Sequence, residues 1–219
     1  MSYNEFLNRL ISCKLCPRLV KYRSSFPESY WRRPVPPNGS IDSKIMIVGL
    51  APAGKGGNRT GRMFTGDESA NNLMKALYAV GLANQPFSVS KDDKLKLYDV
   101  YITSAVKCAP PENRPTTEEI KNCSTYLKEE LMMAKNLKVL VALGIIAWNA
   151  VIDTLRELGY EVNKEKFSHG KIIIAKKQDK EVFIIGSYHP SPRNVKTRRL
   201  SIEMLEEVFK KAKELSGIM

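Results

Sequence analysis

The segment KIMIVGL, residues 44–50, decides the fold class of this sequence. It is short, apolar and rich in branched side chains, which is typical of a strand buried on both faces of a parallel sheet. Apolar residues then recur at helical spacing over residues 67–80, and Gly81 is suited to end that helix. A buried strand followed by an amphipathic helix predicts an α/β protein.

The same alternation continues to the end of the chain. We expect further strands at 99–106, 137–143 and 181–187, and helices at 116–134, 145–158 and 201–215. Units in this order have right-handed crossovers, so they predict a parallel sheet with helices on both faces. The first 40 residues are polar and interrupted by prolines, with short helices expected at 3–11 and 17–22. The prediction is one domain over residues 1–219, a three-layer α/β/α fold with a four-stranded parallel sheet and an N-terminal helical arm (1–40).

The composition limits the class of protein. With 219 residues, 43% hydrophobic and 26% charged, the chain fits one ordinary globular core and neither a disordered nor a fibrous protein. The 35 lysines and arginines against 23 acids give a net charge of +12, which favours a polyanionic partner such as nucleic acid or an anionic membrane surface. We find neither an apolar run of about 18 residues nor a signal segment, so we expect a cytoplasmic protein without a membrane partner.

The four cysteines suggest a metal site. Cys13 and Cys16 form a C-x2-C pair in the arm, Cys108 follows the second expected strand, and Cys123 lies in the next helix. Four thiolates suit a 4Fe-4S cluster or a structural zinc ion, and their spacing does not choose between the two. Small buried cysteines are the alternative, but a pair in a polar arm has no core to enter. We therefore expect the four to bind metal jointly and to hold the arm against the sheet.

The stretch from Gly49 to Asp67 follows the first strand and contains six glycines in 19 residues. Gly49, Gly54 and Lys55 match the first part of a phosphate-binding P-loop, but Gly56 stands where a serine or threonine would hold Mg²⁺. This substitution disfavours a nucleoside triphosphatase. A pocket that brings backbone close to a ligand remains as the alternative.

Two side chains at the end of this stretch suit such a pocket. Phe64 could stack on a flat heterocycle, and Asp67 could activate water from the start of the next helix. Taken singly, Phe64 could equally be a core residue and Asp67 a helix N-cap.

The loop after the fourth strand, residues 188–199, contains His189, one of two histidines in the chain. A Pro-Ser-Pro run stiffens this loop, and four of its residues are basic. Basic side chains hold phosphates, a stiff loop can wedge between bases, and an imidazole can donate a proton to a leaving atom. These features are typical of base-flipping enzymes. His189 could also be structural, which is the interpretation we adopt for His169.

Four motifs together resemble one family, the iron-sulfur uracil-DNA glycosylases in their type 5, or B-type, branch. They are Cys13-x2-Cys16-Pro-Arg, the glycine-rich loop with Asn58-Arg-Thr-Gly-Arg-x-Phe-Thr-Gly-Asp67, Val106-Lys-Cys108-Ala-Pro-Pro-Glu-Asn113, and His189-Pro-Ser-Pro-Arg-Asn194. The resemblance covers nearly the whole chain. It implies a four-stranded parallel sheet between helices, a 4Fe-4S cluster on Cys13, Cys16, Cys108 and Cys123, and DNA repair by hydrolysis of the N-glycosidic bond of a flipped deaminated base.

The resemblance also suggests roles for individual residues. Asp67 would orient water, His189 would stabilise the departing base anion, and Asn113 would be a second polar group near the base or water. The base pocket would include Phe64, Gly49, Ala51, Asn58 and Ser104, and the DNA contacts would come from Ser191, Arg193, Lys196, Arg198 and Arg199. The expected partner is DNA containing uracil or other deaminated bases, and the expected state is a monomer.

The sequence departs from related branches of this family at the positions that recognise the base. Leu50 and Ala51 stand where many relatives carry an acid or an amide, and the second strand ends in Thr103-Ser104-Ala105 without an amide. Discrimination for uracil should therefore be looser, so hypoxanthine becomes a plausible substrate. A non-catalytic nucleic-acid-binding module is the competing function class, but binding alone would not require Phe64, Asp67, Asn113 and His189 at separate strand ends.

Overall fold

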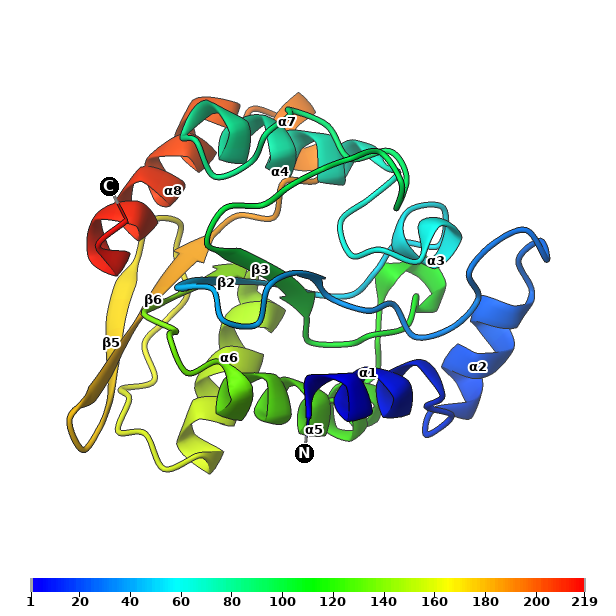
Figure 1. Ribbon diagram of the computed structural model, residues 1–219, viewed down its shortest axis with the longest axis horizontal. Coiled ribbons are helices and arrows are strands. Elements are labelled where there is room, and N and C mark those ends of the chain that lie inside the picture. Colours follow the sequence, from blue (N-terminus) through cyan, green and yellow to red (C-terminus); the bar gives the residue numbers. More distant parts are fainter. Residues whose placement is uncertain (1, 219) are drawn as a thin grey trace.

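The computed structural model describes residues 2–218 and has a central sheet between two layers of helices (Figure 1). The strand order is β1 (Asn38–Gly39), β3 (Val100–Ser104), β2 (Ile45–Gly49), β4 (Val139–Leu143), β6 (Lys180–Ser187) and β5 (Ile172–Lys177). The four inner strands β3, β2, β4 and β6 are parallel and correspond to the four expected strands. The predicted three-layer α/β/α fold is confirmed.

The sheet of the described residues has six strands, because one strand that the sequence did not predict is added at each side of the four parallel ones. Both additional strands are antiparallel edges: β1 pairs with β3, and β5 pairs with β6. The two-residue β1 depends on Gly39, because a Cβ there would lie 2.1 Å from the carbonyl oxygen of Val100. In β5 buried and exposed residues alternate, which is the pattern of an edge strand and not of the fully buried runs that revealed the inner strands.

Two apolar layers cover the faces of the sheet. Helices α4 (Glu68–Ala79) and α8 (Ile202–Ser216) lie above it in Figure 1, and α5 (Thr117–Met133) and α6 (Ile145–Glu157) lie below. Successive residues of β2 serve opposite faces: Ile45 and Ile47 pack in the first layer, Met46 and Val48 in the second. All five residues of β2 are buried because helices cover both sides of the strand.

The N-terminal arm forms a third apolar cluster below the sheet. It contains α1 (Tyr3–Ile11), as expected, and α2 (Pro17–Ser24), which ends two residues later than expected. Phe6, Leu10 and Leu19 are buried against Val106 and Tyr126. The short helices α3 (Gly57–Thr60), η1 (Pro111–Asn113) and α7 (Pro192–Lys196) lie in the connections between the main elements. Helix α7 corrects our expectation that residues 188–199 form an irregular loop.

The connections after β2, β3, β4 and β6 all start on the same side of the sheet, at the carboxyl ends of the strands, because these four strands are parallel. Ligand sites of α/β proteins form beyond these carboxyl ends. No helix within residues 2–218 has the length and apolar composition needed to cross a membrane.

Candidate active site and cysteine pocket

A pocket of about 340 Å³ lies at the carboxyl ends of the parallel strands. This volume falls at the lower end of the range for small-molecule sites, roughly 300–1,000 Å³. Its lining brings together six of the residues expected from the sequence, namely Ala51, Phe64, Asp67, Asn113, His189 and Ser191. They come from the connections that follow β2, β3 and β6, so three separate segments of the chain build one pocket.

Phe64 and His189 form one wall of this pocket. Their ring centroids are 5.9 Å apart and their planes are inclined by 33°. Gly49, at the end of β2, lets the phenyl ring approach the strand, since a Cβ on Gly49 would lie 2.7 Å from Cε2 of Phe64. Phe64 also has a positive φ of 48°, a conformation that is strained for a bulky residue. The role of Gly49 is therefore to make room for Phe64 beside the pocket.

Asp67 is the N-cap of α4 and also lines the pocket. Its Oδ1 accepts the N–H of Ala70 at 2.9 Å, while Oδ2 lies over Gly56, where a Cβ would be 2.0 Å from this oxygen. Burial raises the pKa of the Asp67 carboxyl above its ordinary value, although the N–H groups of Ala70 and Ser69 and the charge of Arg59 act in the opposite direction. Asp67 is therefore a helix N-cap that also faces the pocket, and its carboxylate is a better proton acceptor than an exposed aspartate.

His189 follows the end of β6 and is half-buried, with part of its surface open to the pocket. Burial lowers the pKa of His189 to about 4, since the protein around the ring disfavours the charged form. At neutral pH the imidazole is therefore uncharged, with one nitrogen that donates and one that accepts. It can donate a hydrogen bond to an oxygen that gains negative charge.

Asn113 reaches the pocket from the connection after β3. Glu112 and Asn113 both have positive φ, 54° and 55°, at the end of η1. Asparagine tolerates this left-handed conformation better than most residues. The turn delivers an amide, which can donate and accept, to the same pocket as Asp67 and His189.

Three of the residues expected to bind the base do not line the pocket: Ser104, Asn58 and Gly49, the last of which only makes room for Phe64. Ser104 is fully buried, and its hydroxyl donates to the carbonyl oxygen of Val106 at 2.8 Å. Asn58 is fully buried too, and neither polar atom of its side chain has a hydrogen-bond partner within the described residues.

The residues expected to contact DNA lie on and after α7, next to the pocket. Ser191 lines the pocket and caps α7, since its hydroxyl accepts the N–H of Asn194 at 3.3 Å. Arg193 and Arg198 are exposed, and Lys196 lies 3.9 Å from the carboxylate of Glu68. Arg199 is also exposed, but its guanidinium lies over the ring of Tyr188 at 4.6 Å and so helps to hold the loop.

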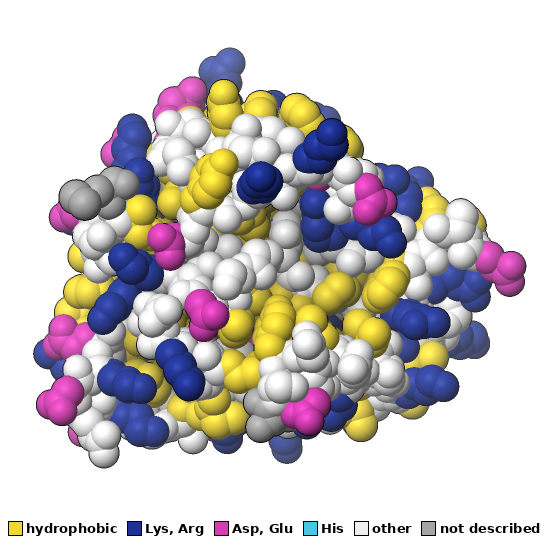
Figure 2. Space-filling model, in the orientation of Figure 1, with side chains coloured by type: hydrophobic (Ala, Val, Ile, Leu, Met, Phe, Trp, Pro, Cys, Tyr) yellow, Lys and Arg dark blue, Asp and Glu magenta, His cyan; other side chains and the backbone are white. Residues whose placement is uncertain are grey.

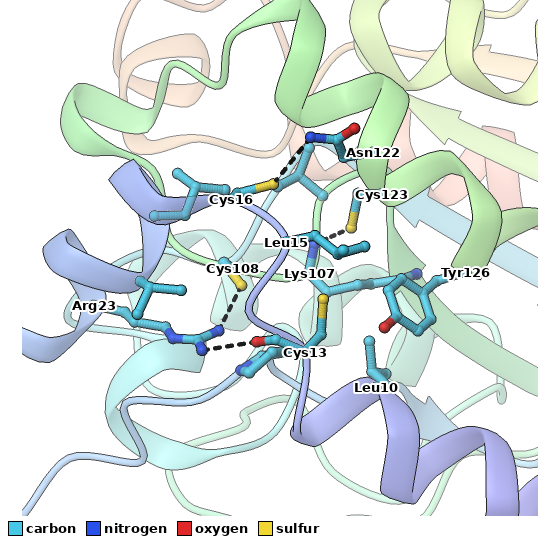
Figure 3. A pocket seen from close by; sticks show the side chains of 14 residues that line it. Leu10, Cys13, Leu15, Cys16, Arg23, Lys107, Cys108, Asn122, Cys123 and Tyr126 are labelled. Atoms are coloured by element: carbon cyan, nitrogen blue, oxygen red, sulfur yellow. Dashed lines mark hydrogen bonds between the residues drawn. The ribbon is translucent and has the colours of Figure 1, made fainter.

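All four cysteines line a second pocket, between the arm and α5 (Figure 3). Cys13 and Cys16 come from the turn before α2, Cys108 from the segment after β3, and Cys123 from α5. Within residues 2–218, no three cysteine, histidine or acidic side chains are close enough together to hold a single metal ion. Figure 3 shows the four cysteine side chains around one region, with the side chain of Leu15 between them in this view.

Several donors point at these sulfurs. Arg23 Nη1 donates to Cys108 at 2.9 Å, the N–H of Lys107 donates to Cys123 at 3.2 Å, and Asn122 donates to Cys16 at 3.8 Å. Burial raises the pKa of the Cys108 thiol to about 11 and that of Cys123 to about 12, so both thiols stay protonated unless bound iron or zinc stabilises the thiolate.

Arg23 gives independent information about the contents of the cysteine pocket. Its side chain is buried, its Nε has no hydrogen-bond partner, and its other two nitrogens donate to Cys108 Sγ and to the carbonyl oxygen of Cys13, with no carboxylate within salt-bridge distance among the described residues. A buried guanidinium without an acid indicates that the site holds negative charge, because isolated buried charges are unfavourable. Four thiolates around iron would supply that charge, so the residues present fit an iron-sulfur cluster.

A buried polar network that the sequence did not predict lies beneath the end of β3. Lys107 Nζ donates to Glu130 Oε2 at 2.6 Å, to Ser104 O at 2.7 Å and to the hydroxyl of Thr103. The Glu130 carboxylate also accepts from Thr103 at 2.7 Å and from Tyr101 at 3.0 Å. The only local signal was a lysine between Val106 and Cys108 in an otherwise apolar run.

Comparison with known proteins identifies the family. Residues 36–213 match the model of the uracil DNA glycosylase superfamily. The type-5 uracil-DNA glycosylase of Pyrobaculum aerophilum is 52% identical, covering 99% of this chain and 95% of that protein. The corresponding enzyme of Thermus thermophilus is 41% identical over all of both chains, and the type-4 enzyme of Archaeoglobus fulgidus is 30% identical over 99% and 94%. Together with a pocket that combines an aromatic ring, a carboxylate and a neutral imidazole, these matches show that the chain belongs to the uracil-DNA glycosylase superfamily, in its type 5 branch.

Proposed function

We propose that this DNA glycosylase hydrolyses the N-glycosidic bond of uracil in DNA after flipping the nucleotide into the pocket beside Phe64. The observation that carries the proposal is the convergence of Phe64, Asp67, Asn113 and His189 on one pocket large enough for a base. Extrusion costs a few kcal/mol and less for a mismatched base, which favours uracil opposite guanine. The products are an abasic site and the base, which leaves as an anion and then takes up a proton from solvent.

His189 stabilises the leaving base in this mechanism. When the bond between C1′ and the base nitrogen breaks, the base leaves with the electron pair and its carbonyl oxygen gains negative charge. The neutral imidazole donates a hydrogen bond to this oxygen, and a donor already in place acts more strongly than water would. Its pKa of about 4 supports this role, since the ring needs no deprotonation at neutral pH.

Asp67 acts on the sugar side. Its carboxylate orients water towards C1′, accepts the proton that the water loses as the new C–O bond forms, and offsets the positive charge of the oxocarbenium-like sugar. The raised pKa of Asp67 supports its action as the base. Asn113 contributes a polar group beside the base or the water, and Phe64 stacks on the base.

The decisive experiment measures single-turnover excision of uracil from a U·G duplex by Asp67→Ala and His189→Ala. Loss of a general base or of a preorganised donor lowers the rate by about 10²- to 10⁴-fold. Glu207→Gln, which removes an exposed carboxylate on α8, is the control and keeps the wild-type rate. Wild-type rates in both pocket variants would refute the proposed site. Salt-dependent DNA binding without release of any base would instead favour a non-catalytic binding module.

We further propose that the enzyme accepts other deaminated bases, hypoxanthine in particular. Ala51 and its neighbours Leu50 and Pro52 give this part of the pocket an apolar lining, and the Ser104 hydroxyl is bonded to its own chain. A pocket with few fixed polar partners discriminates weakly between planar bases of related shape. Alkali cleavage of duplexes bearing uracil, hypoxanthine or xanthine tests this proposal, and release of uracil alone would contradict it.

DNA contacts are proposed for Ser191, Arg193, Lys196 and Arg198, which surround α7 at the edge of the pocket. Their charges would hold the phosphates on either side of the flipped nucleotide. We also propose that the protein is a monomer. Light scattering at assay concentrations tests the monomeric state.

For the cysteine pocket we propose a 4Fe-4S cluster bound by Cys13, Cys16, Cys108 and Cys123. The four sulfurs that line one pocket and the uncompensated charge of Arg23 support a negatively charged tetrathiolate centre, and the choice of a cluster over a zinc ion rests on the resemblance to the iron-sulfur branch of the family. When bound, the cluster would cross-link the arm, β3 and α5, since the reaction requires no electron transfer. Iron and sulfide analysis with a visible absorption spectrum tests this proposal. A colourless protein that contains zinc would refute it.

A further inference from the structure

The main chain around His189 is held by side chains at three consecutive residues. His169 Nδ1 accepts the N–H of Tyr188 at 3.1 Å, and Asn194 Nδ2 donates to the carbonyl oxygen of His189 at 2.8 Å. Asn72 Nδ2 donates to the carbonyl oxygen of Pro190 at 3.1 Å. The three side chains belong to three different segments, so this loop is fixed from several directions.

Asn72 differs from the other two because of the element that carries it. It lies in α4, it is buried, and it contacts Pro190 across 118 residues of sequence. The same helix begins at Asp67, whose carboxylate lines the pocket. Five residues of α-helix span about 7.5 Å and behave as one rigid piece. Helix α4 therefore carries Asp67, the proposed general base. Through Asn72 it also holds the loop that contains His189, the proposed hydrogen-bond donor.

Because this loop is stiff, the hydrogen bond from Asn72 also restricts the position of the His189 imidazole. Pro190 directly follows His189, its ring fixes φ, and its buried carbonyl oxygen is the group that Asn72 holds. A misplacement of about 1 Å at a reacting group can cost about 10²-fold in rate. The hydrogen bond from Asn72 lies one residue from His189, so its loss can displace the imidazole by a distance of this order.

We propose that Asn72 is a positioning residue, which sets the place of the His189 imidazole relative to the Asp67 carboxylate through its hydrogen bond to Pro190. The inference rests on the role proposed above for His189. Asn72 does not line the pocket and needs no contact with the substrate.

The first test is Asn72→Asp, which keeps the shape of the side chain but replaces the donor by an acceptor facing the Pro190 oxygen. We expect the single-turnover rate on a U·G duplex to fall about 10- to 100-fold, with the dissociation constant for the duplex unchanged within about twofold. Asn71→Asp is the matched control. It adds the same charge one residue away, and because Asn71 uses its amide oxygen to accept the N–H of Ser88, the aspartate keeps that bond.

The second test combines the variants. If Asn72 acts through His189, then Asn72→Asp adds no further loss in a His189→Ala background. Asn72→Ala, which removes the donor without adding charge, replaces Asn72→Asp if the latter does not fold. A merely structural role would instead lower the rate by the same factor in both backgrounds.

The outcomes separate this inference from the proposed site. A wild-type rate for the Asn72 variants, or an undiminished further loss in the His189→Ala background, overturns the positioning role while the proposed function stands. A wild-type rate for His189→Ala itself overturns both the role of His189 and this inference.

Discussion

Two titratable side chains of the pocket have pKa values displaced in the directions that their proposed tasks require. The pKa of Asp67 is raised and that of His189 is lowered to about 4, and burial is the largest cause of both shifts. Burial acts in opposite directions because it disfavours the charged form, which is the deprotonated form of an aspartate and the protonated form of a histidine. Burial in the same pocket therefore favours both a carboxylate that accepts protons, Asp67, and an uncharged hydrogen-bond donor, His189.

The pH dependence of excision follows from these shifts. We expect the single-turnover rate constant to be level through neutral pH and to fall only on the acid side, as Asp67 takes up a proton and loses its ability to accept one from water. His189 should cause no step near pH 6.5, the ordinary pKa of histidine, since its own pKa is about 4. Rates measured from about pH 4.5 to 9 check this. A step near pH 6.5 that disappears in His189→Ala would contradict it.

The buried pair Lys107–Glu130 gives a prediction about stability. Lys107→Met leaves the Glu130 carboxylate buried without a cation, so the free energy of unfolding should fall by about 3–5 kcal/mol. Changing both partners, as Lys107→Met with Glu130→Gln, should restore a large part of that loss.

Thermal and urea denaturation measure the effect of this pair. The control is Lys128→Met, which breaks the partly exposed pair with Glu157 and should change stability by less than about 1 kcal/mol. Equal losses in the two single variants would show that burial of the Lys107–Glu130 pair has no special weight.

At the scale of elements, a polar contact adds to the apolar one that fastens the arm to the rest of the fold. Arg18 of α2 forms a two-point contact with Glu119 of α5, from Nε to Oε1 at 2.7 Å and from Nη2 to Oε2 at 2.6 Å. Glu119 also completes the capping box of α5 with Thr116. The hydrogen bond from Arg18 is the largest cause of the lowered pKa of the Glu119 carboxyl, so this contribution to stability is present above the ordinary pKa of glutamate and is lost as pH falls through the lowered value.

Removal of this contact should loosen the arm more than the sheet. In Arg18→Gln we expect faster amide hydrogen exchange in α1 and α2, while the global free energy of unfolding falls by no more than about 1 kcal/mol, because half-exposed ion pairs contribute little. Lys21→Gln, an exposed charge on the same helix, should leave exchange unchanged. Unaltered exchange in Arg18→Gln would mean that the apolar cluster alone holds the arm.

At the scale of the whole molecule, the excess of positive charge is unevenly spread. Figure 2 shows Lys and Arg side chains over the side of the molecule where α2 and α3 lie and also on the opposite side, where Asp and Glu side chains lie among them, and exposed basic residues also follow the pocket around α7. Lysines elsewhere are often paired, as Lys210 is with Glu207 and Lys211 with Glu214 on α8. The +12 charge of the chain is thus partly a candidate DNA surface and partly solvated helix faces.

The salt dependence of DNA binding distinguishes basic residues that contact DNA from those that lie on solvated helix faces. Arg193→Gln should reduce the slope of log affinity against log salt by about 1 if its side chain neutralises one phosphate. Lys210→Gln on α8 should leave the slope unchanged, because this lysine pairs with Glu207 instead. Binding of a U·G duplex measured between about 50 and 200 mM salt checks both. Equal slopes in the two variants would remove Arg193 from the DNA surface.

The sequence by itself determined the four parallel strands, the long helices and the three segments that build the pocket, because each has a local signal. Buried apolar runs such as residues 44–50, capping patterns such as Thr116 to Glu119, and glycine-rich or proline-rich connections are all visible within about 20 residues of chain. The family was likewise evident from ordered motifs, and the matches over nearly the full chain confirmed it.

Only the tertiary structure decided which polar side chains meet. The edge strands β1 and β5, the pair Lys107–Glu130 and the contact of Asn72 with Pro190 join residues whose sequence neighbours carry no mark of the partner. The same holds for Ser104 and Asn58, which the motifs suggested for the base pocket and which the fold buries outside its lining. Local periodicity specifies an element and its buried face, whereas a hydrogen bond across 118 residues depends on how several elements pack at once.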